Sequence, residues 1–209
     1  MQDFKAILEP DNYYHIYNRA NGREKLFANE DNYKFFLKQY MFYISPIAHT
    51  LTYCLMPNHF HFVVKIKEEK NLVPLSGSGT LKPFQKFETF EKFASKQFSN
   101  LFSSYTQAFN KQNKRMGSLF MPRFNRKKIT SDNYLKHSIN YIHQNPIMHH
   151  YVSDLEKWKY SSYLSIINNK ATKLKKQEVL DLFHDKQNFI DCHTLKKAEY
   201  FAEKNNLNY

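Results

Sequence analysis

The chain has 209 residues, 42% of them hydrophobic and 17% aromatic, which suits one domain with a substantial core. Its two cysteines are too few for a disulfide framework, its four glycines argue against a glycine-rich phosphate loop, and no apolar run is long enough to span a membrane, so we expect a cytoplasmic protein without a membrane partner. Lys and Arg outnumber Asp and Glu by 31 to 19, and this net charge of +12 favours nucleic acid as a partner, although a generally lysine-rich composition gives the same sign.

The first part of the chain alternates between strand and helix patterns. Residues 13–19 are rich in aromatics and alternate in the manner of a strand, and a turn follows them. Residues 32–43 carry apolar side chains at helical spacing, and Pro46 marks the end of this helix. Residues 48–56 and 59–67 read as two strands separated by a Pro-Asn pair, which predicts an antiparallel hairpin.

The middle of the chain begins with a break in this pattern. Residues 68–92 are polar and contain a Ser-Gly-Ser-Gly run, so we expect a flexible surface insertion there. A long helix is then predicted over 93–114. The basic and aromatic segment 119–128 is predicted to be a strand or an extended loop.

The rest of the chain is expected to be helical. One helix is predicted to run from a Ser131 or Asp132 cap to Pro146, which terminates it. We predict one domain over residues 1–165 and a lysine-rich helical extension over residues 166–209.

Two histidines lie one residue apart at the start of the second hairpin strand. Side chains alternate between the two faces of a strand, so His59 and His61 share one face while Phe60 points to the other. Paired imidazoles on a rigid strand are well placed to bind a divalent metal. An unliganded pair of half-exposed histidines is the commoner case for so short a motif, so the pair alone is a candidate only.

The helix after Ser131 can supply further groups to such a site. Residues three and four apart share a helix face, so Tyr141 and Asn145 lie one turn apart on a polar stripe with His137 and Ser138. A phenol and an amide so placed could both face a metal held by the histidine pair. A tyrosine on a helix flank is more often structural, and the residues alone leave both interpretations open.

Taken together, the motifs resemble the REP-associated tyrosine transposases, within the histidine-hydrophobe-histidine (HUH) superfamily of single-strand tyrosine transposases. The matching segments occur in the family's order over residues 13–163 and read YHIYNR from Tyr14, MPNHFH from Met56, RF from Arg123, YIHQNP from Tyr141 and WKYSSY from Trp158. The resemblance implies an α+β fold in which a central antiparallel sheet, ferredoxin-like or RRM-like, carries the His-x-His pair and is covered by helices. It also implies metal-dependent cleavage and rejoining of single-stranded DNA near hairpins.

The resemblance also implies roles for individual residues. His59 and His61 match the family's metal-binding histidines, Asn145 falls at the position of a third, amide ligand, and Tyr141 matches the nucleophile. This ligand set leaves coordination positions for water and phosphate, which fits Mg²⁺ or Mn²⁺. Tyr141 would take the 5′ phosphate as a phosphotyrosine and release a 3′ hydroxyl. Tyr134, on the same helix, is a rival nucleophile outside the motif.

Basic residues that could contact the DNA backbone lie near these motifs. The candidates are Arg19, Arg23, Arg123, Arg126, Lys127 and Lys128. Each of them is as readily explained as a solvated surface residue. We expect single-stranded or hairpin DNA as the partner and a chain that acts as a monomer or a homodimer.

Two other functions remain open at this point. A domesticated, non-catalytic hairpin-DNA-binding protein would have the same fold and charge. A hydrolase using metal-activated water would cleave without leaving a protein–DNA adduct. The joint presence of the two histidines, the tyrosine and the amide favours the transposase.

Overall fold

The computed structural model describes residues 5–68, 70, 89–205 and 207 of the chain. Most of the insertion predicted over 68–92 therefore lies outside the described residues. No helix in the described part of the chain combines the length and the apolar character needed to cross a bilayer.

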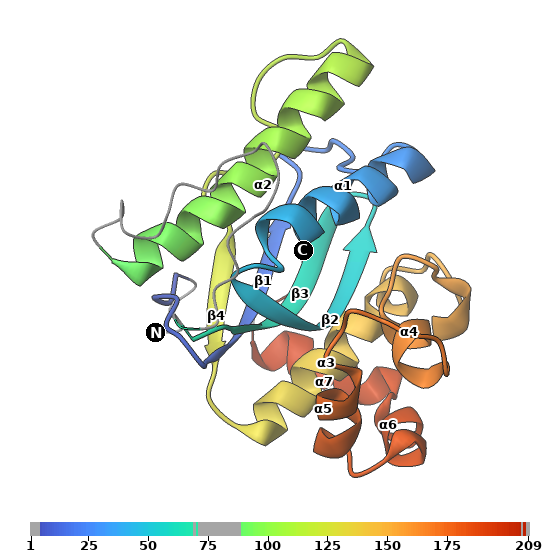
Figure 1. The fold of residues 1–209 in the computed structure, drawn as a ribbon. Helices are drawn as coiled ribbons and strands as arrows, with labels where there is room; N and C mark the ends of the chain where they lie inside the picture. Colours follow the sequence, from blue (N-terminus) through green and yellow to red (C-terminus); the bar gives the residue numbers. More distant parts are fainter. Residues whose placement is uncertain (1–4, 69, 71–88, 206, 208–209) are drawn as a thin grey trace.

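A four-stranded antiparallel sheet forms the centre of the molecule (Figure 1). Its strands are β1 (Tyr13–Arg19), β2 (Ala48–Met56), β3 (His59–Ile66) and β4 (Asn125–Ile129), in the spatial order β2-β3-β1-β4. Helix α1 (Glu30–Tyr43) connects β1 to β2, and helix α2 (Phe90–Asn113) precedes β4. This βαββαβ arrangement is ferredoxin-like, and the predicted α+β fold with a central antiparallel sheet is confirmed.

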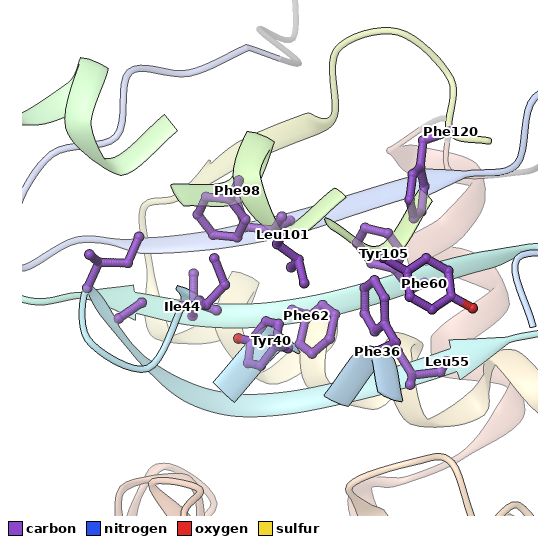
Figure 2. Close-up of a cluster of buried hydrophobic side chains, with 14 of the residues drawn as sticks. Phe36, Tyr40, Ile44, Leu55, Phe60, Phe62, Phe98, Leu101, Tyr105 and Phe120 are labelled. Atoms are coloured by element: carbon purple, nitrogen blue, oxygen red, sulfur yellow. The ribbon is translucent and has the colours of Figure 1, made fainter. Parts of the chain in front are cut away.

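Helices α1 and α2 cover one face of the sheet and build an aromatic core with it (Figure 2). Phe60 and Phe62 point to this face from β3, as the alternation along the strand requires. Tyr40 of α1 stacks on Phe62 with 4.2 Å between ring centroids, and Tyr105 of α2 lies 5.1 Å from Phe36. These contacts pack one face of β3 into the core, so the side chains on its opposite face have fixed positions.

The second face of the sheet is covered by α3 (Asp132–Met148) and by the C-terminal helices, which lie below the sheet in Figure 1. These elements are η3 (Leu155–Lys157), α4 (Tyr163–Ile167), α5 (Lys176–Leu182), α6 (Lys186–Cys192) and α7 (Leu195–Lys204). Helix α7 packs along α3, and its Phe201 belongs to the same buried cluster as Ile139 and Ile142. The predicted extension is thus helical where it is described, and it shares a hydrophobic core with the sheet.

The structure confirms the predicted start of α3 but not its predicted end. Ser131 is the N-cap, because its side chain accepts a hydrogen bond from the backbone N–H of Tyr134. The expected stop at Pro146 is wrong, since α3 continues to Met148. A proline in the last turn removes only one N–H, and the Pro146 carbonyl is satisfied by the N–H of Tyr151 where the chain turns back.

Other boundaries shift by a few residues. Helix α2 begins at Phe90 rather than 93 because Thr89 caps it. Of the ambiguous segment 119–128, only the part from Asn125 onward is a strand.

Candidate functional site

Strand β3 presents two buried histidines to the face covered by α3. His59 and His61 lie on this face, as predicted, but they are buried rather than half-exposed. Burial is the main cause that lowers the pKa of His59 to about 4, and it lowers the pKa of His61 well below 6.5. Both rings are therefore neutral near pH 7, the state in which an imidazole can donate a lone pair to a metal.

Helix α3 brings the other two predicted residues against this pair. The ring of Tyr141 stands edge-on to His61 with 5.4 Å between centroids, and Oδ1 of Asn145 lies 3.2 Å from Nε2 of His59. The Asn145 amide donates to the backbone carbonyl of Tyr141 at 2.9 Å, which keeps its oxygen turned toward His59. The fold thus gathers all four residues from two elements some eighty residues apart in the chain.

The surroundings of His59 fit a bound cation. Its Nδ1 lies 2.8 Å from Oδ1 of Asn58, and its Nε2 lies 3.2 Å from Oδ1 of Asn145. A neutral imidazole has one N–H. With that proton on Nδ1, a nitrogen lone pair and an amide oxygen face each other at Nε2, and a divalent metal would relieve their repulsion. Within the described residues no group of three His, Cys, Asp or Glu could hold a metal, so an amide oxygen would have to complete the protein ligands.

A third histidine joins the pair, and the sequence analysis assigned it no role. Nε2 of His15 on β1 lies 2.8 Å from Nδ1 of His61, and both rings are fully buried. If His61 donates its Nδ1 proton to His15, its Nε2 lone pair is kept for a metal. Burial, with a smaller effect of the Lys127 charge, lowers the pKa of His15 to about 3. Only the pairing of β1 with β3 reveals this contact, so a motif within one strand could not have identified it.

The C-terminal segment closes the site over Tyr141. Tyr141 is 1% exposed, its hydroxyl donates to the backbone carbonyl of Leu207 at 3.2 Å, and the Phe201 ring lies 5.8 Å from its own. Burial is the main cause that raises the pKa of the Tyr141 phenol, so the hydroxyl is protonated near neutral pH. The rival Tyr134 lies two turns earlier on α3, where it packs on Phe201. In this conformation Phe201 of α7 and Leu207 cover Tyr141.

His143 of α3 belongs to a separate buried cluster on the other side of the helix. Its Nε2 lies 2.6 Å from the Thr52 hydroxyl and 2.8 Å from the Ser162 hydroxyl, and its Nδ1 lies 2.8 Å from Nε2 of His193. These bonds fasten the residues after α6 to α3 and β2. His143 therefore has a structural role, away from the histidine pair.

Three of the six predicted DNA-contacting cations are exposed. They are Arg19, Arg23 and Arg123. Arg19 is paired with His59 across β1 and β3, and its charge contributes to the low pKa of His59. The half-buried His149, at the C-cap of α3, lies on His59 with 5.0 Å between ring centroids. Arg19 and His149 thus lie beside His59 at the end of the sheet where β3 begins.

The other three predicted cations are engaged within the protein. Arg126 donates to Glu91 at 2.9 Å, and Lys128 forms an ion pair with Glu9. Lys127 is buried, donates to the Asn205 carbonyl at 2.7 Å, and has a pKa lowered by burial to about 8. Their predicted contact with DNA remains a prediction, and it would compete with these bonds.

Comparison with known proteins places this geometry in context. No protein-family model matches the chain. A protein of Haemophilus influenzae (strain ATCC 51907 / DSM 11121 / KW20 / Rd) described as a REP-associated tyrosine transposase is 25% identical over 116 residues, 54% of this chain and 58% of that protein. A solved REP-associated tyrosine transposase bound to a REP hairpin superposes with a TM-score of 0.57 at 15% identity, over 80% of this chain and 86% of that one. The chain resembles the REP-associated tyrosine transposases.

The resemblance expected from the motifs is therefore confirmed. The chain spans less than two thirds of the length of the curated Haemophilus protein, and at 15% identity the structural match shows a shared fold. A bacterial tRNA(His) guanylyltransferase-like protein also superposes, with a TM-score of 0.41 and 12% identity over 88% of this chain and 74% of that one, which is too remote to support an argument.

Proposed function

We propose that this protein is a metal-dependent transposase or endonuclease that cleaves and rejoins single-stranded DNA near hairpins through a 5′-phosphotyrosine on Tyr141. The observation that carries the proposal is the meeting of His59, His61, Asn145 and Tyr141 in one buried cluster. The resemblance to REP-associated tyrosine transposases supports hairpin DNA as the partner.

His59, His61 and the Asn145 oxygen would hold the metal. Bound Mg²⁺ or Mn²⁺ would neutralise charge at the scissile phosphate. Arg19, exposed beside His59, is placed to contact a neighbouring phosphate of the strand.

Tyr141 would perform the covalent step. Its phenol must lose a proton to solvent, because the protonated hydroxyl is a weak nucleophile. The phenolate oxygen then bonds to phosphorus, the bond from phosphorus to the 3′ oxygen breaks, and that oxygen leaves as a 3′ hydroxyl after taking up a proton. The ester linkage is conserved, so a 3′ hydroxyl can attack the phosphotyrosine, release Tyr141 and rejoin DNA without ATP.

A second candidate is a non-catalytic hairpin-DNA-binding protein. It is favoured by the closure of the site, since the Tyr141 hydroxyl is bonded to Leu207 and shielded from solvent. Such a protein would bind hairpins and form no covalent bond to them.

The experiment that separates the two candidates is a search for a protein–DNA adduct. Purified protein and Mn²⁺ are mixed with single-stranded oligonucleotides carrying the palindromes that flank its gene, and the products are run on a denaturing gel. We expect an adduct that is lost in Tyr141→Phe and His61→Ala and kept in Tyr134→Phe, the same substitution on the same helix. Hairpin binding without an adduct would support the binding protein, and cleavage unchanged in Tyr141→Phe would assign the chemistry to activated water.

A further inference from the structure

Three aromatic side chains lie next to one another between the residues that follow α3 and the end of β2. The rings of Tyr151 and Trp158 have centroids 5.6 Å apart, and those of Trp158 and Tyr160 are 5.9 Å apart. Tyr160 stacks on the buried Tyr33 at 3.6 Å. We call Tyr151, Trp158 and Tyr160 the aromatic ridge.

The ridge is fixed to the elements that carry the candidate site. The indole N–H of Trp158 donates to the backbone carbonyl of Leu55 at 3.1 Å, and Leu55 is the β2 partner of Phe60, which lies between the two site histidines. At its other end, Tyr151 follows two residues after His149, whose ring lies on His59. The ridge is therefore tied at both ends to residues next to the histidine pair.

The ridge combines an exposed tyrosine ring with neighbouring lysines. Tyr151 is 48% exposed, and Trp158 and Tyr160 are half-buried. The exposed Lys157 and Lys159 alternate with the rings along the chain, and the Lys159 ammonium lies 5.3 Å from the centre of the Tyr160 ring. Lys159 also forms an ion pair with Glu30, so Lys157 is the ridge cation that a phosphate would meet first. A shallow cavity of about 800 Å³ lies alongside, with Tyr151, Lys157 and Glu199 in its wall. Flat rings interleaved with lysines are the combination that binds unpaired nucleic acid.

We infer that the aromatic ridge holds the unpaired strand of a DNA substrate beside the histidine pair, with bases stacked on Tyr151 and Trp158 and a phosphate near Lys157. The inference rests on the proposed function for the choice of DNA. Unpaired DNA fits better than a duplex, because the base faces of a duplex are already stacked on one another. It fits better than an acidic protein segment, because Glu199 lies in the wall of the adjoining cavity and the proposed function already brings single-stranded DNA to the histidine pair.

Trp158 is the only tryptophan of the chain, so its fluorescence reports directly on the ridge. The titration uses the full chain carrying Tyr141→Phe, which removes the nucleophile, with oligo(dT) of twelve nucleotides and a duplex of equal length. We expect quenching by the single strand and little by the duplex. Since a stacked base contributes to affinity by itself, Tyr151→Ala should weaken oligo(dT) binding by about tenfold or more.

Tyr200→Ala is the matched control, because Tyr200 is a 64% exposed tyrosine on α7 that lines a different cavity with Tyr134 and His137. It should change affinity less than twofold. The inference is overturned if oligo(dT) leaves the fluorescence unchanged, if the duplex quenches equally, or if both tyrosine variants bind alike.

The adduct assay separates this failure from failure of the proposed function. If the protein forms an adduct but Tyr151→Ala leaves its affinity for oligo(dT) unchanged, the role of the ridge is refuted and the transposase function stands. If Tyr151→Ala weakens oligo(dT) binding but the wild-type protein forms no adduct, the role of the ridge is supported and the transposase function is refuted.

Discussion

Phe201→Ala should increase the rate at which Tyr141 reacts with DNA. Phe201 is 5% exposed and packs on the rings of Tyr141, Tyr134 and His137, so it holds α7 over the proposed nucleophile. Removing a buried phenylalanine side chain costs about 3–5 kcal/mol, and this loss falls on the closed form because the contacts exist only there. Since about 1.4 kcal/mol is a factor of ten, the lower figure raises the open population about a hundredfold until the open form dominates.

The assay is the initial rate of adduct formation with Mn²⁺ and a hairpin-bearing single strand. Phe189→Ala is the control, since Phe189 is a fully buried phenylalanine of α6 whose ring lies 4.1 Å from that of His193 and not on Tyr141. Hydrogen exchange should show faster exchange of α7 amides in Phe201→Ala. The reasoning is refuted if Phe201→Ala leaves the rate unchanged, or if Phe189→Ala raises it as much.

Three further predictions concern neighbouring groups. His15→Ala should weaken Mn²⁺ binding by about tenfold to a hundredfold, because His61 loses the partner that fixes its tautomer. Isothermal titration calorimetry measures this affinity, and an unchanged value would mean that His15 contributes to packing alone. The free energy of unfolding should fall as the pH drops from 6.5 to 4, because the unfolded chain then binds protons on imidazoles that stay neutral in the folded protein. For His193, whose burial lowers its pKa to about 4, the loss is about 3 kcal/mol. Urea unfolding at several pH values measures this, and a stability that stays constant below pH 6.5 would contradict it. Arg19→Ala should weaken DNA binding and reduce the slope of log affinity against log salt by about one, whereas an unchanged slope would mean that Arg19 contacts no phosphate.

The parts of the fold that follow from short-range periodicity were predictable. The bounds of β1 and β2 match the alternation in the sequence, and the shared face of His59 and His61 follows from the two-residue repeat of a strand. Likewise, the spacing of Tyr141 and Asn145 places them one turn apart on α3, and both face the histidine pair.

What could not be predicted depends on pairing and packing between distant segments. The contact between His15 and His61 requires the register of β1 against β3, which neither strand contains by itself. The amphipathic pattern of α7 shows that it buries a face, but not that this face closes over Tyr141. From the sequence a lysine side chain is expected to be exposed, and only the hydrogen bond to the Asn205 carbonyl explains why Lys127 is buried.

The placement of the proposed nucleophile and the proposed amide ligand one turn apart on α3 has a consequence for how the proposed reaction responds to dilution. Tyr141 and Asn145 both meet histidines of their own chain, so no group of the candidate site has to be supplied by a second copy. The amount of adduct formed per molecule in a single turnover should then be independent of protein concentration. Under the proposed function, such a protein would act on a transient hairpin even where only a few copies are present.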